Sequence, residues 1–212
     1  MLHRFRRAMV RPDRERLKGV VEVDETYLSI SDRDAPVAEG QRKRRKRRKS
    51  RTHQVLVVMA VELLQPKGFG RIRLRRIDND SAEQVVPFVQ TSIEPGAQVR
   101  TDGSAAYLKL KDLGYDHQRT VMLGSDVPAH VSMAGVHRVA ALIKRWILGT
   151  HHGSVQPAHL DSYLDEFAFR FNRRTSKSRG MLFYRLLQQA VVTEPVTYED
   201  VVRPLPKPAK PA

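Results

Sequence analysis

The alternation of apolar and polar positions predicts that the core begins with three strands. Residues 20–29 place Val and Leu at the spacing of a strand, and residues 54–64 are almost continuously apolar, as in a strand buried on both faces. Residues 71–77 alternate between arginine and aliphatic side chains, which indicates a strand with one basic face. Gly68 and Gly70 mark a hairpin between the last two strands, so an antiparallel meander is expected.

Helices and short strands are predicted next. Ser81 and Gln84 have the spacing of a capping box, which starts a helix. Residues 98–101 then form a short strand, Ser104 caps a helix that ends at Gly114, and residues 115–121 are interpreted as a further strand. Apolar side chains at helical spacing predict longer helices over residues 133–149, 157–172 and 181–192.

This order of elements predicts an α/β fold of the RNase H-like class. In that fold three antiparallel strands are followed by a fourth strand parallel to the first, and helices flank the mixed sheet. A length of 212 residues suits one such domain with tails. We interpret residues 1–18 as the remnant of an N-terminal helical region, residues 19–192 as the domain, and residues 193–212 as a Pro-rich disordered tail.

The strong positive charge of the chain favours a negatively charged partner such as a nucleic acid. The net charge is +15, and nine of the eleven residues in 41–51 are Lys or Arg, so the rest of the chain carries only +6. This basic loop, within a predicted loop over residues 31–51, is either a solvated segment or an arm that orders on nucleic-acid phosphates. The second interpretation makes four of its residues candidate DNA-binding residues: Arg44, Arg45, Arg47 and Arg48.

The lengths of the apolar runs and the number of cysteines indicate where in the cell the chain is expected to act. No apolar run approaches the roughly 18 residues needed to span a bilayer, so no membrane partner is expected. The chain has no cysteine, which agrees with a reducing cytoplasm and excludes disulfides and thiolate zinc sites.

Asp24 is an acidic residue in the middle of the first predicted strand. A carboxylate buried in a strand is unfavourable unless it is paired or binds a cation. Asp102 ends the fourth predicted strand, and in an RNase H-like sheet the first and fourth strands are neighbours, so the two carboxylates are expected to face each other. Two hard oxygen ligands suit Mg²⁺ or Mn²⁺, and such a site supports in-line phosphoryl displacement.

The helix predicted over residues 133–149 offers a third ligand. No acidic residue lies between Asp126 and Asp161, and this helix instead carries His137, with Lys144 seven residues later on nearly the same face. Imidazole binds divalent metals, although it is softer than Mg²⁺ prefers. Taken singly, each candidate also has a structural interpretation, as a turn aspartate, a packed histidine or a solvated lysine; the ordered set favours the metal site.

Several motifs together resemble the ISXO-like transposases of bacterial insertion sequences, over roughly residues 17–189. The motifs are Val-Glu-Val-Asp24-Glu-Thr-Tyr, Thr-Asp102-Gly with Tyr107, Gly135-Val-His137-Arg, Leu142-Ile-Lys144-Arg, Gly149-Thr-His-His-Gly153, and Tyr163-Leu-Asp-Glu-Phe with Arg170-Phe-Asn-Arg-Arg174. The resemblance implies that residues 19–192 form a DDE-type catalytic domain. Its expected activity is metal-dependent DNA strand cleavage and strand transfer at the ends of an insertion sequence.

The resemblance also implies roles for individual residues. Asp24, Asp102 and His137 are the expected catalytic residues and the ligands of a two-metal Mg²⁺ or Mn²⁺ site. The expected DNA contacts outside the basic loop are Lys144, Arg145, Arg173 and Arg174. Expected partners are transposon-end and target DNA and further copies of the chain on that DNA, in the bacterial cytoplasm at the nucleoid.

Two departures from the family keep an alternative open. His137 stands where other members carry Glu or Asn. The chain also lacks the zinc-ribbon and helix-turn-helix region that normally precedes the domain, so it is expected to be truncated or to start late. The alternative function is therefore a catalytically inactive remnant that binds DNA with a steep salt dependence and little sequence preference.

Overall fold

The computed structural model describes residues 2–10, 14–32, 51–120, 133–194 and 197. The chain divides into two compact units. One unit comprises residues 16–157, and the other combines residues 1–15 with residues 158–212. Within the described part of the chain, no helix is both long and apolar enough to cross a membrane.

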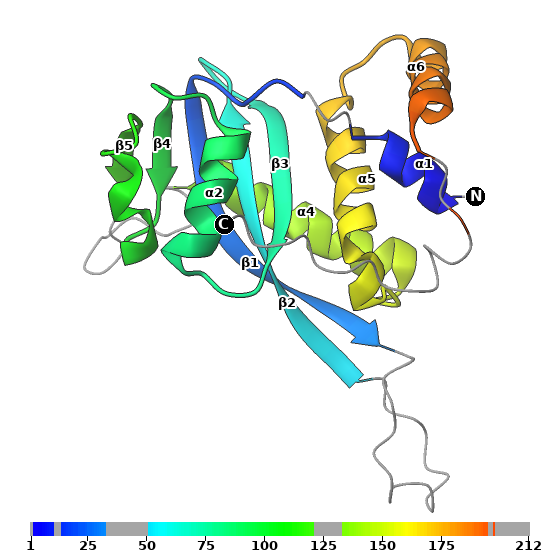
Figure 1. Ribbon diagram of the computed structural model, residues 1–212, viewed down its shortest axis with the longest axis horizontal. Coiled ribbons are helices and arrows are strands. Elements are labelled where there is room, and N and C mark those ends of the chain that lie inside the picture. Colours follow the sequence, from blue (N-terminus) through cyan, green and yellow to red (C-terminus); the bar gives the residue numbers. More distant parts are fainter. Residues whose placement is uncertain (1, 11–13, 33–50, 121–132, 195–196, 198–212) are drawn as a thin grey trace, which may run out of the picture. The chain divides into compact units, whose positions relative to one another are not determined.

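The unit of residues 16–157 is built on a five-stranded mixed sheet. Its strands are β1 (Val20–Asp32), β2 (Arg51–Leu63), β3 (Phe69–Ile77), β4 (Gln98–Thr101) and β5 (Asp116–Arg119), in the spatial order β3-β2-β1-β4-β5 (Figure 1). β1, β2 and β3 pair antiparallel, whereas β4 runs parallel to β1 and β5 parallel to β4. This topology confirms the predicted RNase H-like sheet.

β1 and β2 extend past the rest of the sheet as a two-stranded ribbon (Figure 1). The predicted loop over residues 31–51 is wrong at both ends, because the antiparallel ladder continues until Asp32 pairs with Arg51. The basic run that contains Arg44, Arg45, Arg47 and Arg48 lies outside the described residues.

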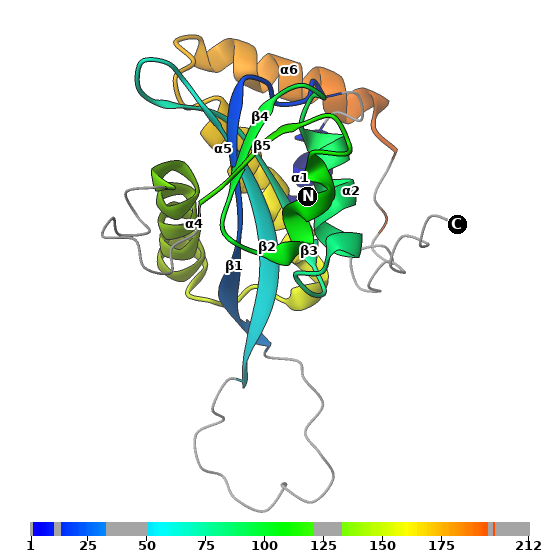
Figure 2. The same cartoon turned by 90° about the vertical axis from the view of Figure 1, so that its left-hand side faces the viewer.

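Helices cover both faces of this sheet, with α2 (Ala82–Ser92) on one side and α4 (Ala134–His151) on the other (Figure 2). Alternate side chains of a strand point to opposite faces. Val58 and Ala60 of β2 belong to the core cluster that includes Phe88 of α2. Val57 and Met59, which point to the other face, are buried as well. β2 is therefore buried on both faces, as its continuous apolar sequence predicts.

The ends of two predicted helices differ from expectation. The capping box at Ser81 is wrong, because the Ser81 side chain makes no cap bond and its hydroxyl donates to Glu83 Oε2 at 3.4 Å instead. The Ser104 cap is confirmed, since its Oγ accepts from Ala106 N at 3.3 Å. The element that follows is a shorter 3₁₀ helix, η1 (Ala105–Leu110).

The second unit is helical. Its elements are α1 (Leu2–Ala8), α5 (Leu160–Asn172), which follows the short 3₁₀ helix η2 (Pro157–His159), and α6 (Arg179–Val192). Within the predicted N-terminal helical region of residues 1–18, the described helix is α1, which ends at Ala8. α1 is held on α5 by Arg6, whose Nε lies 2.8 Å from Glu166 Oε2 and whose guanidinium lies 4.0 Å above the Tyr163 ring.

Glu62 of β2 holds the hairpin to β3. Its carboxylate accepts from Arg71 N at 3.1 Å, from Arg71 Nη2 at 3.2 Å and from Lys18 N at 3.2 Å. Burial acts to raise the pKa of Glu62, but these hydrogen bonds and the Arg71 charge outweigh burial and leave the pKa lowered. The ionised form is thus the form that the fold stabilises.

Glu62→Gln is expected to lower the free energy of unfolding by about 2 kcal/mol at pH 7, because the amide loses a charge that several donors face. The folded-state pKa of Glu62 lies below 4.5, so this contribution is present above pH 4.5 and is lost as pH falls through the folded pKa. Urea unfolding of both proteins at descending pH measures it. Glu94→Gln, at an exposed position, is the matched control and is expected to be neutral.

Candidate active site

Asp24 lies in β1 and is half-buried. Its Oδ1 accepts a hydrogen bond from Glu25 N at 2.8 Å. Burial raises the pKa of Asp24; that hydrogen bond lowers it, and the neighbouring Asp102 carboxylate raises it again. Asp24 is thus a carboxylate whose negative charge is poorly solvated and lies close to a second negative charge.

Asp102 follows β4 directly, and β4 is the parallel neighbour of β1. Its Oδ1 accepts from Ser104 N at 3.0 Å, which fixes the turn into η1. The end of β4 is anchored beneath it, because Thr101 is fully buried and its Oγ1 is hydrogen-bonded to His117 Nε2 at 2.8 Å. Asp24 and Asp102 therefore come within electrostatic range of each other, as the sheet topology predicts.

His137 lies in the first half of α4 and is half-buried. It is close enough to Asp24 and Glu22 for its charge to lower the pKa of both carboxyl groups. Its Nε2 is a buried atom that has no hydrogen-bond partner among the described residues. Buried polar atoms in folded proteins nearly always have a partner, so this nitrogen is suited to bind a ligand of the site.

Glu22 was not among the residues predicted for the site. It is two residues before Asp24, so both side chains point to the same face of β1, which α4 covers. Its side chain is buried, and its Oε2 accepts from Val136 N at 3.0 Å at the start of α4. Burial raises the pKa of Glu22. Glu22 ties the helix that carries His137 to the strand that carries Asp24.

Glu25 was also missed, and it points to the opposite face of β1. Its Oε1 accepts a hydrogen bond from the hydroxyl group of Tyr107, which is fully buried in η1. The pKa of Glu25 is raised to about 7: burial is the main cause, the hydrogen bond from Tyr107 lowers the pKa, and the charges of Asp24 and Asp102 raise it. The sequence does distinguish these three acidic residues. Because side chains alternate along a strand, Glu22 and Asp24 share one face and Glu25 lies on the other.

The chemistry of these side chains fits a hard divalent cation in part. Mg²⁺ and Mn²⁺ accept carboxylate oxygens, such as those of the neighbouring Asp24 and Asp102, and can also accept an imidazole nitrogen such as the His137 Nε2. However, no group of three or more His, Asp or Glu side chains in the described ranges is close enough to hold a metal ion. The ligands are brought near one another, but they do not form a complete set.

Lys144 and Arg145 are exposed in the second half of α4. Lys144 lines a hollow of about 330 Å³ together with residues of the β1–β2 ribbon and of α4 itself: Tyr27, Leu28, Ser29, Gln54, Ile147 and Leu148. Tyr27 is three residues after Asp24, which is about 10 Å along a strand. A basic side chain and an exposed aromatic ring thus line a hollow about 10 Å along β1 from Asp24.

Arg173 and Arg174 lie at the end of α5, in the other unit. The Arg173 guanidinium lies 4.0 Å above the Phe169 ring. Arg174 turns back on its own helix, because its Nη1 donates to the Phe171 carbonyl oxygen at 2.8 Å and its guanidinium lies 4.0 Å above the Phe171 ring. Burial lowers the pKa of Arg174.

Comparisons with known proteins give one family. The family model described as an ISXO2-like transposase domain matches residues 16–172. No curated protein matches. Among solved structures, the chain is similar to the catalytic core domain of BIV integrase, at 13% identity and a TM-score of 0.44, over 81% of this chain and 95% of that one.

Two structures of Mos1 transposase are also similar to the chain. The Mos1 strand transfer complex shares 13% identity at a TM-score of 0.39, over 90% of this chain and 58% of that one. The Mos1 paired-end complex with the left transposon end shares 13% identity at a TM-score of 0.32, over 89% and 62% of the two chains.

Proposed function

The chain belongs to the ISXO2-like transposase domain family, and from this premise we propose that it cleaves DNA strands and transfers them at the ends of an insertion sequence. The observation that supports this proposal most strongly is the electrostatic interaction of three side chains from distant parts of the sequence. Asp24, Asp102 and His137 interact electrostatically across β1, β4 and α4, and the His137 Nε2 is buried without a partner among the described residues.

The proposed reaction has two steps. In the first, a water oxygen bonds to phosphorus at the transposon end and the 3′ oxygen leaves as a hydroxyl group. In the second, that hydroxyl oxygen attacks a phosphodiester of the target DNA, whose own 3′ oxygen leaves. A bound Mg²⁺ or Mn²⁺ supplies Lewis-acid polarisation of the phosphoryl oxygens and lowers the pKa of bound water.

Each residue of the site has a proposed role. Asp24 and Asp102 would hold the divalent cation, which would remove the repulsion between their charges. His137 completes the ligand set through Nε2 or accepts the proton of the attacking water. Glu22 keeps α4 at the strand by accepting the Val136 N–H, so it positions His137 without touching the substrate.

DNA is the proposed partner. Lys144 and Arg145 are exposed on the same helix as His137 and contact the transposon end beside the reacting phosphate. Exposed cations of this kind bind the phosphate backbone and add a salt-dependent, sequence-independent term to the affinity. The basic run of residues 42–49 is proposed to add further phosphate contacts, and this part of the proposal is based only on its sequence of Lys and Arg.

His137 is the residue that tests the metal proposal. His137→Ala is expected to weaken Mn²⁺ binding by about tenfold or more, because it removes a ligand or the group that orients one. His137→Glu supplies a hard oxygen in place of nitrogen and is expected to shift the preference from Mn²⁺ toward Mg²⁺. Isothermal titration of the DNA-free protein with each metal measures both effects. Unchanged Mn²⁺ affinity in His137→Ala would remove His137 from the site.

A second function is favoured by one observation, the lack of a complete three-residue metal cluster among the described residues. In that case the chain binds DNA and does not cleave it. The same titration separates the two functions, since a protein that binds no Mn²⁺ near millimolar concentration but retains DNA affinity fits only the second.

A further inference from the structure

Asp24 and Asp102 lie just beyond the part of the sheet in which their two strands are paired. Residues 20–22 of β1 form a parallel ladder with residues 98–100 of β4. Each aspartate comes two residues after the last pair of this ladder. Ladder hydrogen bonds fix the spacing of paired strands, so beyond the ladder the distance between the two carboxylates depends on other contacts.

Each aspartate is fixed within its own segment of the chain. Asp24 is opposite Met59 of β2 in the antiparallel ladder, and its Oδ1 accepts from Glu25 N at 2.8 Å. Asp102 Oδ1 accepts from Ser104 N at 3.0 Å at the turn into η1. These contacts orient the two carboxylates, but they do not run from one segment to the other.

The Tyr107 hydroxyl group connects the two segments. It donates to Glu25 Oε1, and Glu25 is the neighbour of Asp24 in β1, whereas Tyr107 lies in η1, which begins three residues after Asp102. Tyr107 has no exposed surface and belongs to the core cluster that contains Phe88. Burial and the Glu25 charge raise the pKa of Tyr107, so the hydroxyl group keeps the proton that it donates.

This hydrogen bond resists movement at both ends. Because the Tyr107 ring is packed in the core, its hydroxyl group has no water to turn to, and breaking the bond leaves a buried donor without an acceptor. η1 passes the restraint on to Asp102 through Ser104, whose Oγ caps η1 and whose N–H binds the Asp102 carboxylate. One continuous series of contacts therefore runs from Asp24 through Glu25 and η1 to Asp102.

We propose that the Tyr107–Glu25 hydrogen bond sets the separation of Asp24 and Asp102, which makes Tyr107 and Glu25 positioning residues of the candidate active site. Their role rests on the proposed function, because that function supplies the divalent cation for the two aspartates. Glu25 points to the face of β1 opposite Asp24, and Tyr107 is fully buried, so both act through the aspartates. Metal sites require ligand distances correct to about 0.2 Å, so a small change of separation is enough to weaken binding.

The first test is isothermal titration of the full, DNA-free chain with Mn²⁺. Tyr107→Phe keeps the ring and removes only the hydroxyl group. It is expected to weaken Mn²⁺ binding by about tenfold or more, since losing a group that orients metal ligands typically costs about 10- to 100-fold in affinity.

Tyr115→Phe is the matched control. It removes the hydroxyl group from another buried tyrosine of the same core cluster, which donates to the Ile93 carbonyl oxygen at 3.3 Å. It should lose stability in urea, as Tyr107→Phe does, but it should bind Mn²⁺ as tightly as the wild type. The pair separates a loss of stability from a loss of positioning.

Glu25 supplies the conservative variant. Glu25→Gln keeps an oxygen that accepts from Tyr107, so it is expected to retain most of the Mn²⁺ affinity. Glu25→Ala removes the acceptor and is expected to match Tyr107→Phe. The double variant with Tyr107→Phe and Glu25→Ala should be no weaker than either single one, because both changes remove the same bond.

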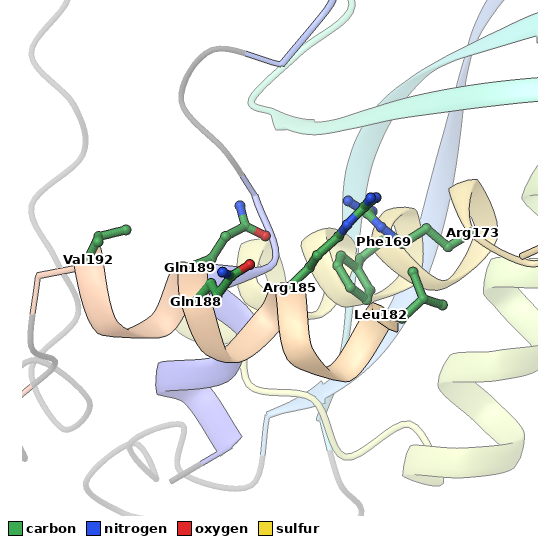
Figure 3. A pocket seen from close by; sticks show the side chains of 7 residues that line it. All are labelled: Phe169, Arg173, Leu182, Arg185, Gln188, Gln189 and Val192. Atoms are coloured by element: carbon green, nitrogen blue, oxygen red, sulfur yellow. The ribbon is translucent and has the colours of Figure 1, made fainter. Parts of the chain in front are cut away.

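The hollow of about 460 Å³ that Phe169 and Arg173 of α5 line with five residues of α6 is not expected to contribute to this titration (Figure 3). None of its lining side chains is acidic, and Arg173 and Arg185 carry positive charge that repels a cation. A change in Mn²⁺ affinity therefore does not report on this hollow.

A second measurement needs no metal. Asp24 and Asp102 repel each other, so the effects of Asp24→Asn and Asp102→Asn on the free energy of unfolding should not add in the metal-free wild type. Without the Tyr107 hydroxyl group this repulsion can push the two segments apart. The coupling between the two changes should thus be smaller in Tyr107→Phe and unchanged in Tyr115→Phe.

Three results would overturn the proposal: equal Mn²⁺ affinity of Tyr107→Phe and Tyr115→Phe, unchanged coupling of the aspartates in Tyr107→Phe, or equally weak binding by Glu25→Gln and Glu25→Ala, which would show that Glu25 acts through its charge. Circular dichroism checks folding, and if Tyr107→Phe does not fold, the two Glu25 variants still decide. If the wild type binds no Mn²⁺, the metal site of the proposed function is wrong, and the metal-free coupling still decides whether the bond sets the separation.

Discussion

Asp24→Asn abolishes Mn²⁺-dependent strand cleavage, by an expected factor of about a thousand or more, while DNA affinity stays within about twofold. The loss is large because metal binding contributes several kcal/mol to the transition state and each 1.36 kcal/mol is about tenfold in rate. Asp102→Asn is expected to behave in the same way. DNA affinity persists because the proposed phosphate contacts lie on other residues.

Although Asp24→Asn should lose activity, the metal-free variant is expected to be more stable than the wild type. Burial and the Asp102 charge raise the pKa of Asp24, so the fold disfavours the ionised form at pH 7. Replacing it with a neutral amide should therefore raise the free energy of unfolding. Thermal unfolding with and without Mn²⁺ measures this, and Mn²⁺ should raise the Tm of the wild type but not that of Asp24→Asn.

The control for this prediction is Asp112→Asn, the same chemical change at an exposed position. It should leave cleavage, Mn²⁺ stabilisation and unfolding unchanged. If Asp24→Asn and Asp102→Asn together cleave DNA as fast as the wild type, the proposed centre is wrong. If neither the variants nor the wild type cleave, but all bind DNA, the inactive DNA-binding function is correct.

Gly135→Ala is expected to lower the free energy of unfolding by about 1–3 kcal/mol, because it overpacks the contact of α4 with the sheet. A Cβ atom at Gly135 would lie 2.8 Å from Glu22 Oε2, 3.0 Å from Leu63 Cδ2 and 3.3 Å from Val61 Cγ1. Each of these is shorter than a normal contact, so the Glu22 side chain, its neighbours on β2 or α4 itself must shift. His137 is two residues further on the same helix, so Mn²⁺ affinity should fall as well.

Gly149→Ala in the same helix is the matched control. No heavy atom lies within 4 Å of a Cβ at this position, so alanine should stabilise the helix by about 0.5–1 kcal/mol through its higher helix propensity. Urea unfolding compares the two variants. Equal stability of Gly135→Ala and Gly149→Ala would show that α4 does not need the close approach at Gly135.

The sheet was predictable because hydrophobic periodicity reflects burial directly. The continuous apolar run of β2 requires cover on both faces, and α2 and α4 supply it. The ends of elements were less predictable, since they depend on local competition. Ser81 has the right spacing for a capping box, but its hydroxyl donates to Glu83 instead, and the ribbon continues to Asp32 and Arg51 through ladder hydrogen bonds that sequence patterns do not encode.

The supporting groups of the site were missed for a similar reason. Glu22 and Glu25 stand on either side of Asp24, and nothing in their spacing says which partner each will meet. The tertiary structure gives Glu22 the Val136 N–H of α4 and gives Glu25 the Tyr107 hydroxyl group of η1. These contacts join segments that are 114 and 82 residues apart.

By itself the sequence determined the fold class and the family resemblance, and it singled out Asp24, Asp102 and His137 as candidate site residues, because strand order and motif spacing are properties of the chain. Only the tertiary structure decided how those side chains are solvated and what surrounds them. Burial and the fields of neighbouring charges act through space, so they made Asp24 a poorly solvated carboxylate and left the His137 Nε2 without a partner among the described residues.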